Sequence, residues 1–406
     1  MFLNGISNKK GNIYLPSDTL SESWPFFYST YNDGNLFYLG QTKNDEPVVF
    51  DQFKINNYRK NSNVVILGTS GSGKSTLAKK LISYQLKAGN KIIVIDPENE
   101  YKKFSEYHNG NWVDFHFTSE TSFNPFKLLI QDSDNDKIKV TNEHSFWLRG
   151  WFSSLYPILN EDQLNQIEWS ISSFYIKWFE TRELDESPLL NDWIGFGNID
   201  ENILNLFKRD FDKDGKFQKM YCKYSNVNWS NNLSVVNVKK IYETNDARVL
   251  VNSIYTILKN IQLIINNNMN SKSQKILIFI DEAHIFINDE NKMVLDFLYQ
   301  LSKRIRKYNA GLMIATQNPS DFNLYGSDQR KASAILANSQ YNFFLNMKPS
   351  DIENVHQLYK TSGGLTEPEK KYLSVARKGE ALLSIGPYER LLININYNEI
   401  EQKYCY

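Results

Sequence analysis

The segment from residue 64 to residue 88 constrains the fold of this chain more than any other segment. Residues 68–75 read Gly-Thr-Ser-Gly-Ser-Gly-Lys-Ser and match the pattern G-x-x-x-x-G-K-[S/T] at every fixed position. The apolar run 64–67 predicts a buried strand, and the helix formers of 74–88 predict a helix that ends at Gly89. Glycines let the loop backbone turn its N–H groups inward at close range, and the helix start adds the positive end of its dipole. The segment therefore predicts an anion site.

The residue types in this loop predict that the anion is a nucleotide with its metal ion. A lysine at position 74 can reach the β- and γ-phosphates of ATP, and the hydroxyl of Ser75 can ligate Mg²⁺. We therefore expect ATP and Mg²⁺ to bind here. The residues expected to contact the nucleotide are Gly68, Thr69, Ser70, Gly71, Ser72, Gly73, Lys74, Ser75 and Thr76.

Further apolar and β-branched runs predict a sheet that is buried on both faces. Short, wholly apolar strands of this kind are typical of parallel sheets, in which helices cover both faces. Before residue 60 the chain predicts only short strands and turns. The class is therefore α/β with a mainly parallel sheet. The runs that predict its strands, besides the one before the loop, are 92–95, 276–280, 312–315 and 343–345.

The middle of the chain predicts helices instead of strands. Asn160 and Gln163 have the spacing of a capping box, and apolar residues between 249 and 261 recur at spacings of three and four. We therefore predict an all-helical insertion within a nucleotide-binding core. The predicted parts are residues 1–125 (N-terminal strands and the first part of the core), 126–265 (the insertion) and 266–406 (the second part of the core).

A pair of carboxylates ends the apolar run 276–280. Asp281 at this strand tip is expected to hold Mg²⁺ through its water shell, and Glu282 to orient the attacking water. Adjacent Asp and Glu are common in proteins, but the run before them and the loop upstream favour a functional pair. For His284 we favour a packed or hydrogen-bonded side chain.

Two further strand ends supply polar side chains for the same site. The strand 92–95 is expected beside the phosphate-binding strand, so that Asp96 or Glu100 would hold water or the metal ion; the alternative is a turn with solvated acids. Gln317 follows the run 312–315. If that strand lies between the two strands already described, Gln317 would point at the γ-phosphate and report its loss.

A basic cluster at 303–308 has two interpretations. Basic residues at a helix end complement the helix dipole, or one of them reaches the γ-phosphate of a neighbouring subunit or contacts DNA. For the catalytic alternative we favour Arg306, and Arg377 is a second candidate.

The composition excludes several classes of protein. Forty-six basic and forty-six acidic residues balance, and apolar residues make up 41% of the chain, so the chain is not predicted to be disordered. The neutral total gives no support for a polycation that coats nucleic acid. Two cysteines, Cys222 and Cys405, are too few for a disulfide framework and favour a reducing compartment. We find no transmembrane segment and no signal peptide.

Taken together, these motifs resemble those of the HerA/FtsK group of RecA-like motor ATPases. Within that group they are most similar to the conjugative type IV secretion ATPases of the VirB-four (TraE/TrsE/CagE) type. His284 departs from this type, which more often has Trp there, and agrees with DNA-pumping relatives. The segments that carry the resemblance are 15–18, 24–26, 68–75, 96–101, 280–283, 315–321, 365–367 and 379–383.

The resemblance implies a RecA-like core with a helical appendage that hydrolyses ATP, in a hexameric ring with nucleotide at the subunit interfaces. It also implies type IV secretion membrane components as partners, at the cytoplasmic inner face of the cell membrane, with DNA as a further candidate. This family usually carries another N-terminal domain, and Met1 falls just before the motor domain, so we expect a fragment or a truncated relative.

Three functions remain open at this point. The first is an ATPase that powers conjugative DNA or protein transfer or pilus assembly, and the second is a DNA translocase or coupling protein of the same group. The third is a nucleotide-binding assembly scaffold, against which the intact Asp281, Glu282 and Gln317 argue. The neutral net charge favours the first over the second, because a translocase would benefit from a basic channel.

Overall fold

The computed structural model describes residues 31–128, 134–181, 187–271, 274–286, 292–317, 326–360, 363–386 and 389–406. The motif segments at 15–18, 24–26 and 318–321 lie outside these residues, so the predictions made on them are not addressed by the structure.

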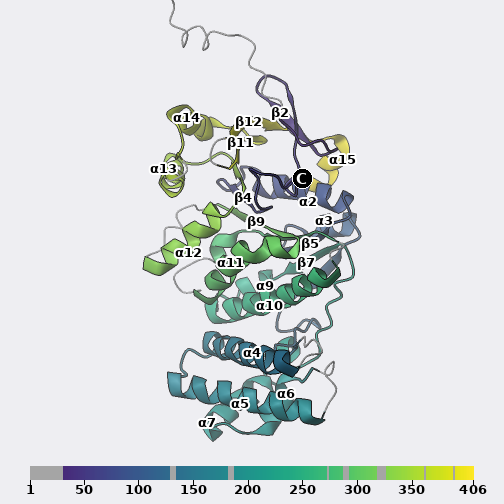
Figure 1. Cartoon of the computed structure of the whole chain (residues 1–406), viewed down its shortest axis with the longest axis vertical. Coiled ribbons are helices and arrows are strands. Elements are labelled where there is room, and N and C mark those ends of the chain that lie inside the picture. The colour runs from purple at the N-terminus through teal and green to yellow at the C-terminus, as the bar shows by residue number, and fades with distance from the viewer. Residues whose placement is uncertain are drawn as a thin grey trace, which may run out of the picture.

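Twelve strands of the described residues form a single sheet that runs through the upper part of the molecule in Figure 1. In spatial order they are β1 (Tyr31–Asn32), β3 (Pro47–Val49), β2 (Tyr38–Thr42), β12 (Glu389–Ile395), β11 (Glu380–Ile385), β10 (Tyr341–Phe344), β4 (Val64–Leu67), β9 (Ala310–Thr316), β8 (Ile276–Ile280), β5 (Lys91–Asp96), β7 (Leu233–Asn237) and β6 (Asn111–Asp114).

The strands from β10 to β6 are all parallel to their neighbours. The remaining strands β11, β12, β2 and β3 join antiparallel, with β1 added parallel to β3. The predicted α/β class with a mainly parallel sheet is therefore confirmed. Parallel strands bring their carboxyl ends to one edge, which is where ligands bind in open α/β sheets.

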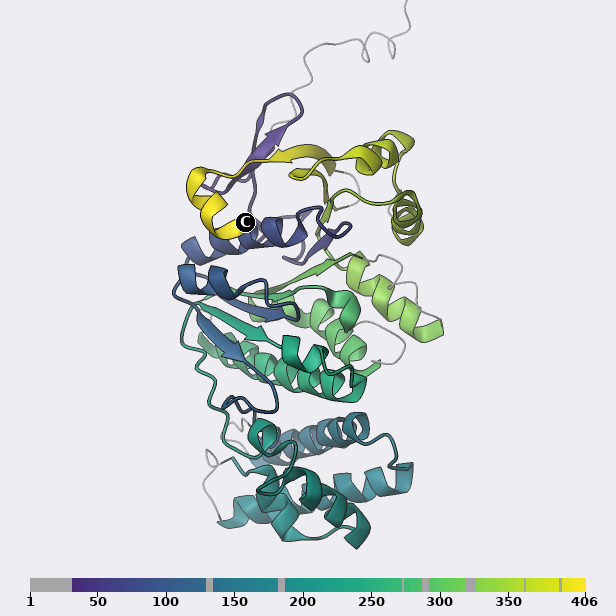
Figure 2. The ribbon, with the colours of Figure 1, turned by 180° about the vertical axis from the view of Figure 1, so that it is seen from behind.

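Alternate residues of the parallel strands enter two separate cores. Val65 and Leu67 of β4 pack in the core that contains α10 (Ala247–Ser271) and α11 (Lys292–Arg304). Val64 and Ile66 pack on the opposite face with α2 (Lys74–Lys87), α3 (Lys102–Tyr107) and α15 (Glu399–Cys405), which lie together in Figure 2. Because helices cover both faces of the sheet, these strands are apolar throughout.

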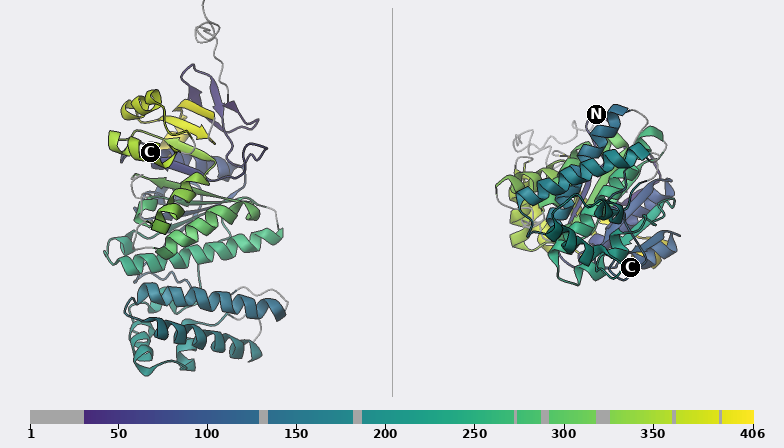
Figure 3. Two further views of the ribbon diagram at one scale, coloured as in Figure 1. Left: turned by 60° about the vertical axis from the view of Figure 1, so that its left-hand side comes forward. Right: turned by 90° about the horizontal axis from the view of Figure 1, so that it is seen from below.

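A layer of helices lies beyond α10, at the end of the molecule away from β2 (Figures 1 and 3). Its aromatic core includes Trp151, Phe152, Trp193 and Phe207. The predicted capping box is present, since Asn160 Oδ1 accepts the Gln163 amide N–H at 2.9 Å and the Gln163 side chain accepts that of Asn160 at 3.0 Å. The helices of this layer are α4 (Asp134–Leu155), α5 (Glu161–Thr181), α6 (Leu190–Phe196), α7 (Glu201–Phe211) and α8 (Gln218–Tyr221).

The range 126–265 is not all helical, and this part of the prediction is wrong. It contains strand β7, which pairs with β5 and β6 inside the sheet. The strand is short, carries Ser234 and Asn237, and follows several asparagines, so its apolar pattern is weak. The boundaries of the three predicted parts otherwise remain a prediction. The remaining short helices are α9 (Lys239–Tyr242), η1 (Ala283–Ile285), η2 (Ile305–Tyr308), α12 (Gly326–Ala337), α13 (Pro349–Leu358) and α14 (Glu367–Val375).

The sequence predicts no membrane-spanning helix, but helix α10 has the length and the apolar composition of one. By length and composition alone, Ala247–Asn268 is apolar enough to cross a membrane, with a mean hydropathy of 1.2. In the fold, however, 67% of that window is buried. Its side chains also bond to α4, because Asn252 donates to the Trp151 carbonyl at 3.0 Å and Thr256 accepts the Trp151 indole N–H at 2.7 Å. The helix is therefore a core element of this structure.

A buried ion pair fastens α15 to α2, and its loss should destabilise the fold. Lys80 Nζ lies 2.7 Å from Glu401 Oε2, and the two side chains are 1% and 2% exposed. Glu401→Ala should lower the free energy of unfolding by about 3–5 kcal/mol, because a buried ammonium loses its carboxylate. Urea denaturation measures this change. The exposed Lys403→Ala on the same helix should change it by less than about 0.5 kcal/mol, and equal losses would contradict the assignment.

Candidate functional site

The glycine-rich loop joins β4 to α2 at the carboxyl edge of the sheet. Gly73 has a φ of 102°, in the left-handed region that favours glycine, and α2 begins at the next residue. A Cβ on Gly68 would lie 2.5 Å from Ser72 Oγ and 2.8 Å from Leu345 Cβ, so the backbone passes too close for any side chain. Both glycines are therefore required by the path of the loop.

A pocket of about 440 Å³ opens beside this loop. It is lined by loop residues and by side chains from three other strand ends. The sequence-predicted residues that line it are Ser70, Gly71, Gly73, Lys74, Ser75, Thr76, Glu100, Glu282 and Gln317. Four segments that are far apart in the sequence therefore meet at one edge of the sheet.

Glu282 forms an ion pair with the lysine of the loop. Lys74 Nζ lies 3.3 Å from Glu282 Oε1, and both side chains are at least nine-tenths buried. His284 Nδ1 lies 3.2 Å from the other carboxylate oxygen. Burial alone would raise the pKa of the Glu282 carboxyl, but His284 and Lys74 hold that pKa below its ordinary value. Glu282 is therefore anionic near neutral pH. His284 is largely buried against Glu282, in agreement with the packed side chain favoured from the sequence.

Asp281 is a buried carboxyl in an acidic environment. Burial first, and then the charges of Glu282, Asp96 and Glu100, raise the pKa of Asp281 to about 8. A divalent cation bound nearby would favour the ionised form of this carboxyl.

The donor set of the pocket fits Mg²⁺ held together with a nucleotide. Within the described ranges no group of three or more His, Cys, Asp or Glu has the arrangement of a metal site. Magnesium, however, usually takes only one or two protein ligands beside phosphate oxygens and water. The Ser75 hydroxyl lines the pocket, and the Ser72 hydroxyl is buried without a hydrogen-bond partner in the described part of the chain. The residues present are therefore suited to the predicted cofactor pair.

The strand that ends at Asp96 lies elsewhere than expected. Strand β5 pairs with β8 and β7, and β9 and β8 separate it from β4. The Asp96 carboxylate accepts the amide N–H groups of Glu98 at 3.2 Å, Glu100 at 3.1 Å and Tyr101 at 2.9 Å. Asp96 therefore shapes a turn and has few lone pairs left for a ligand. The turn directs Glu98 and Glu100 to the pocket.

Gln317 occupies the place that the sequence order suggested. Strand β9 lies between β4 and β8, with Leu67 beside Thr316 and Ile280 beside Ile314. Gln317 follows directly after β9 and lines the pocket with Lys74 and Glu282.

The two candidate arginines do not line this pocket. Arg306 is exposed on η2 at the amino end of β9, where its guanidinium donates to the Lys60 carbonyl at 3.4 Å. The seven residues of β9 separate it from the loop by roughly 20 Å. Arg377 is exposed on the turn before β11, and its amide donates to Glu380 Oε2 at 2.7 Å.

The structure adds residues that the sequence reasoning missed. Lys79, Lys378, Cys405 and Tyr406 also line the pocket. Asn346 lies behind the loop, where its carbonyl accepts the Thr69 amide N–H at 2.9 Å. No local motif marks these positions, because tertiary packing alone brings them to the loop.

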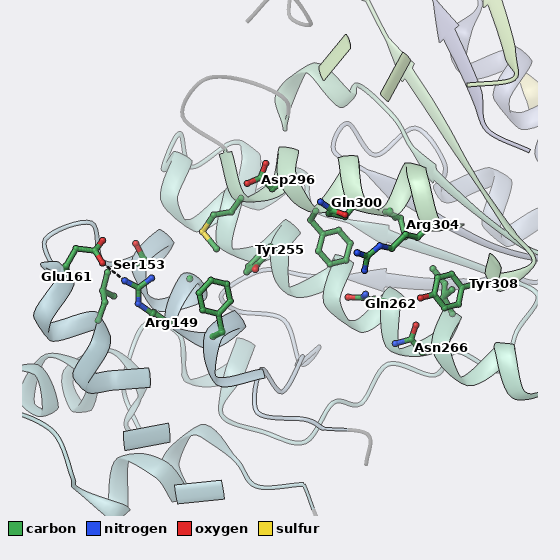
Figure 4. Close-up of a pocket in the computed structure, with 17 residues that line it drawn as sticks. Arg149, Ser153, Glu161, Tyr255, Gln262, Asn266, Asp296, Gln300, Arg304 and Tyr308 are labelled. Atoms are coloured by element: carbon green, nitrogen blue, oxygen red, sulfur yellow. Dashed lines mark hydrogen bonds and ion pairs between the residues drawn. The ribbon is translucent and has the colours of Figure 1, made fainter. Parts of the chain in front are cut away.

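A larger cavity of about 550 Å³ lies between the helical layer and the core helices α10 and α11 (Figure 4). It is lined by apolar side chains such as Phe146, Tyr255 and Met293, and Arg149 forms an ion pair with Glu161 at one end. None of the predicted site residues lines it. The predicted site residues therefore gather at the smaller pocket and not at this cavity.

A strand–loop–helix unit of this sequence, with a carboxylate pair and a polar strand tip beside it, defines the class of P-loop NTPases. The family model of the TraG P-loop domain matches residues 37–401, and the chain belongs to this family. Curated relatives include HerA, a DNA double-strand break repair helicase of Sulfolobus acidocaldarius, and TraC of Escherichia coli K12. The predicted resemblance to the HerA/FtsK group is thereby confirmed.

These relatives are distant. An uncharacterized protein of Bacillus anthracis is 23% identical over 94% of this chain and 67% of its own length. HerA is 23% identical over 84% of this chain and 65% of its own length, and TraC is 23% identical over 74% and 34%. The chain thus spans about two thirds of the first two relatives and about a third of TraC.

Solved structures show the same fold. VirB4 of Thermoanaerobacter pseudethanolicus has a TM-score of 0.77 and 24% identity, and the likeness covers 92% of this chain and 100% of that one. The conjugative coupling protein TrwB, in complex with ADP and Mg²⁺, has a TM-score of 0.55 and 12% identity over 93% and 95%. The predicted P-loop NTPase fold is confirmed by these structures.

The side-chain hydrogen bonds of Asn346 should stabilise the fold around the loop. Its side-chain amide donates to the carbonyls of Leu373 at 3.2 Å, Ser374 at 3.4 Å and Ala376 at 3.1 Å. Asn346→Asp should lower the free energy of unfolding by about 1–3 kcal/mol, because a carboxylate cannot donate to these carbonyls. Urea denaturation measures the change.

A matched control is Asn111→Asp, since the half-buried Asn111 side chain makes one hydrogen bond within the described residues, to the Asn228 carbonyl. An equal loss in the two variants would contradict a special role for Asn346.

Proposed function

We propose that this protein is a Mg²⁺-dependent ATP hydrolase that powers a conjugative type IV secretion system. The observation that carries the proposal is the meeting of Lys74, Glu282 and Gln317 in one pocket beside the glycine-rich loop. These residues supply a phosphate-binding cation, a carboxylate for water and an amide for the γ-phosphate. The proposed substrate is ATP.

The reaction is an in-line attack of water on the γ-phosphate of ATP. Lys74 and the N–H groups of the loop bind the β- and γ-phosphates, and Glu282 orients the water and accepts its proton. Ser75, and Asp281 through a water molecule, would hold Mg²⁺, which would offset the negative charge that develops on the phosphates. Gln317 contacts the γ-phosphate and transmits its loss along β9.

We propose that an arginine from a second copy of the chain adds positive charge to the pocket. No arginine lines it within the described residues, and Arg306 is exposed at the opposite edge of the sheet. In a closed ring one subunit's amino edge meets its neighbour's carboxyl edge, so Arg306 would act in trans. This supports a homo-oligomer, with a hexamer as the proposed ring.

The role in secretion comes from the relatives. TraC is a distant relative in sequence, and VirB4 and the coupling protein TrwB have the same fold. The TrwB structure holds ADP and Mg²⁺. We propose by analogy that membrane components of a secretion system are partners, and that the protein works at the cytoplasmic face of the membrane.

A second candidate function is that of a DNA translocase. The observation that favours it is His284, which lies against Glu282, together with the similarity to the helicase HerA. An assembly scaffold is a third function, which would use nucleotide binding without turnover.

Glu282→Gln should separate nucleotide binding from hydrolysis. ATP turnover should fall by about 100-fold or more, because a neutral amide cannot accept the proton, while ADP should still bind. Phosphate release and ADP titration measure the two effects. Glu98 lines the same pocket but has no ion pair with Lys74 among the described residues, so Glu98→Gln should keep most of the activity. Equal turnover in Glu282→Gln and the wild type would refute the assignment, and unchanged transfer in cells would favour the scaffold.

Added DNA should distinguish the two motor functions. For a secretion ATPase we expect hydrolysis that duplex and single-stranded DNA change little. Strong stimulation, which falls steeply as salt is raised, would instead establish the translocase, because DNA binding releases counterions. Turnover at several salt concentrations, with and without DNA, is the measurement.

A further inference from the structure

The turn between α14 and β11 places a second lysine over the glycine-rich loop. Lys378 lines the same pocket as Lys74 and Ser75. A Cβ on Gly73 would lie 3.4 Å from Lys378 Cγ and 3.8 Å from Lys378 Cε, so the side chain of Lys378 passes directly over the loop. Lys378 is exposed, so a ligand in the pocket can reach its ammonium group.

The charge of Lys378 is not neutralised by a carboxylate of the described residues. Its ammonium group lies 4.3 Å from the centre of the Tyr406 ring, which is a cation–π contact. Lys74, by contrast, already has Glu282 as its partner at 3.3 Å. Lys79, which also lines the pocket, is buried, and its ammonium group donates to the Cys405 carbonyl at 3.5 Å. Lys378 is therefore the exposed lysine of this pocket, and its ammonium group is accessible to an anion.

The position of Lys378 is fixed by bonds to the loop itself. The Thr69 amide N–H and hydroxyl both donate to the Asn346 carbonyl, at 2.9 and 3.2 Å, while the Asn346 side chain holds the carbonyl of Ala376, two residues before Lys378. On the other side, the Ile395 amide donates to the Gly379 carbonyl at 2.7 Å. These hydrogen bonds therefore fix the backbone of the turn relative to the loop, as a ligand-binding residue on the turn requires.

We propose that Lys378 is a second phosphate-binding residue, which contacts the phosphate chain of the nucleotide together with Lys74. The proposal rests on the nucleotide site proposed above and adds a residue to it. A nucleoside triphosphate carries several negative charges, and Lys74 and the loop N–H groups offset only part of them. On binding, the Lys378 ammonium exchanges its contact with Tyr406 for a charged phosphate oxygen.

Lys378→Met keeps the aliphatic stem over Gly73 and removes only the charge. We expect its affinity for ADP and for inorganic pyrophosphate to fall about 10-fold each, the loss of one hydrogen bond between charged groups. Lys378→Arg should keep most of the affinity, because the cation is retained. Lys371→Met, an exposed lysine of α14 away from the pocket, should bind as the wild type does. Calorimetric titration measures all four proteins, and the unfolding of ligand-free Lys378→Met should match the wild type.

Lys378→Met that binds ADP as tightly as the wild type would overturn the proposal and leave the nucleotide site intact. A loss for ADP without a loss for pyrophosphate would also overturn it, since the lysine would then act on the nucleoside. If the wild type itself bound neither ligand, the proposed function would fall and the inference with it.

Discussion

The buried ion pair between Lys74 and Glu282 is the interaction on which the site depends. It joins the glycine-rich loop after β4 to the end of β8, two strands away. A buried pair of charges is costly to desolvate, so such a pair contributes little to stability by itself. Its geometry is set by the sheet, because β9 spaces β4 and β8 at about 10 Å and lets the two side chains meet across its tip.

In the proposed reaction this pair is a resting state that the nucleotide changes. The phosphates compete with Glu282 for the Lys74 ammonium, and Glu282 then turns to the attacking water. The environment suits that role, since His284 and Lys74 keep the pKa of Glu282 low and the carboxylate ionised. Asp281 is in the opposite situation, with a pKa raised to about 8 by burial and by neighbouring acids. A divalent cation bound nearby would favour the ionised form of Asp281.

The features predicted correctly from the sequence are those that local residue patterns encode. The loop, its flanking strand and helix, and the carboxylates after β8 follow from motifs with a fixed spacing, and the order of β8 and β9 led to Gln317. Strand order is not local, which is why β5 was expected beside β4 and is found beyond β8. Strand β7 was missed because its serine and asparagine hide the apolar pattern. Asn346 and Lys378 reach the loop only through tertiary contacts, so no pattern marks them.

The proposed function requires one nucleotide site at the carboxyl edge of the sheet, with the metal ion as part of it. Calorimetric titration of the protein with a non-hydrolysable ATP analogue, with and without Mg²⁺, tests this most directly. We expect saturable binding at one site per chain that is tighter with Mg²⁺ and is lost in Lys74→Ala. Absence of binding, or binding that persists unchanged in Lys74→Ala, would contradict the account.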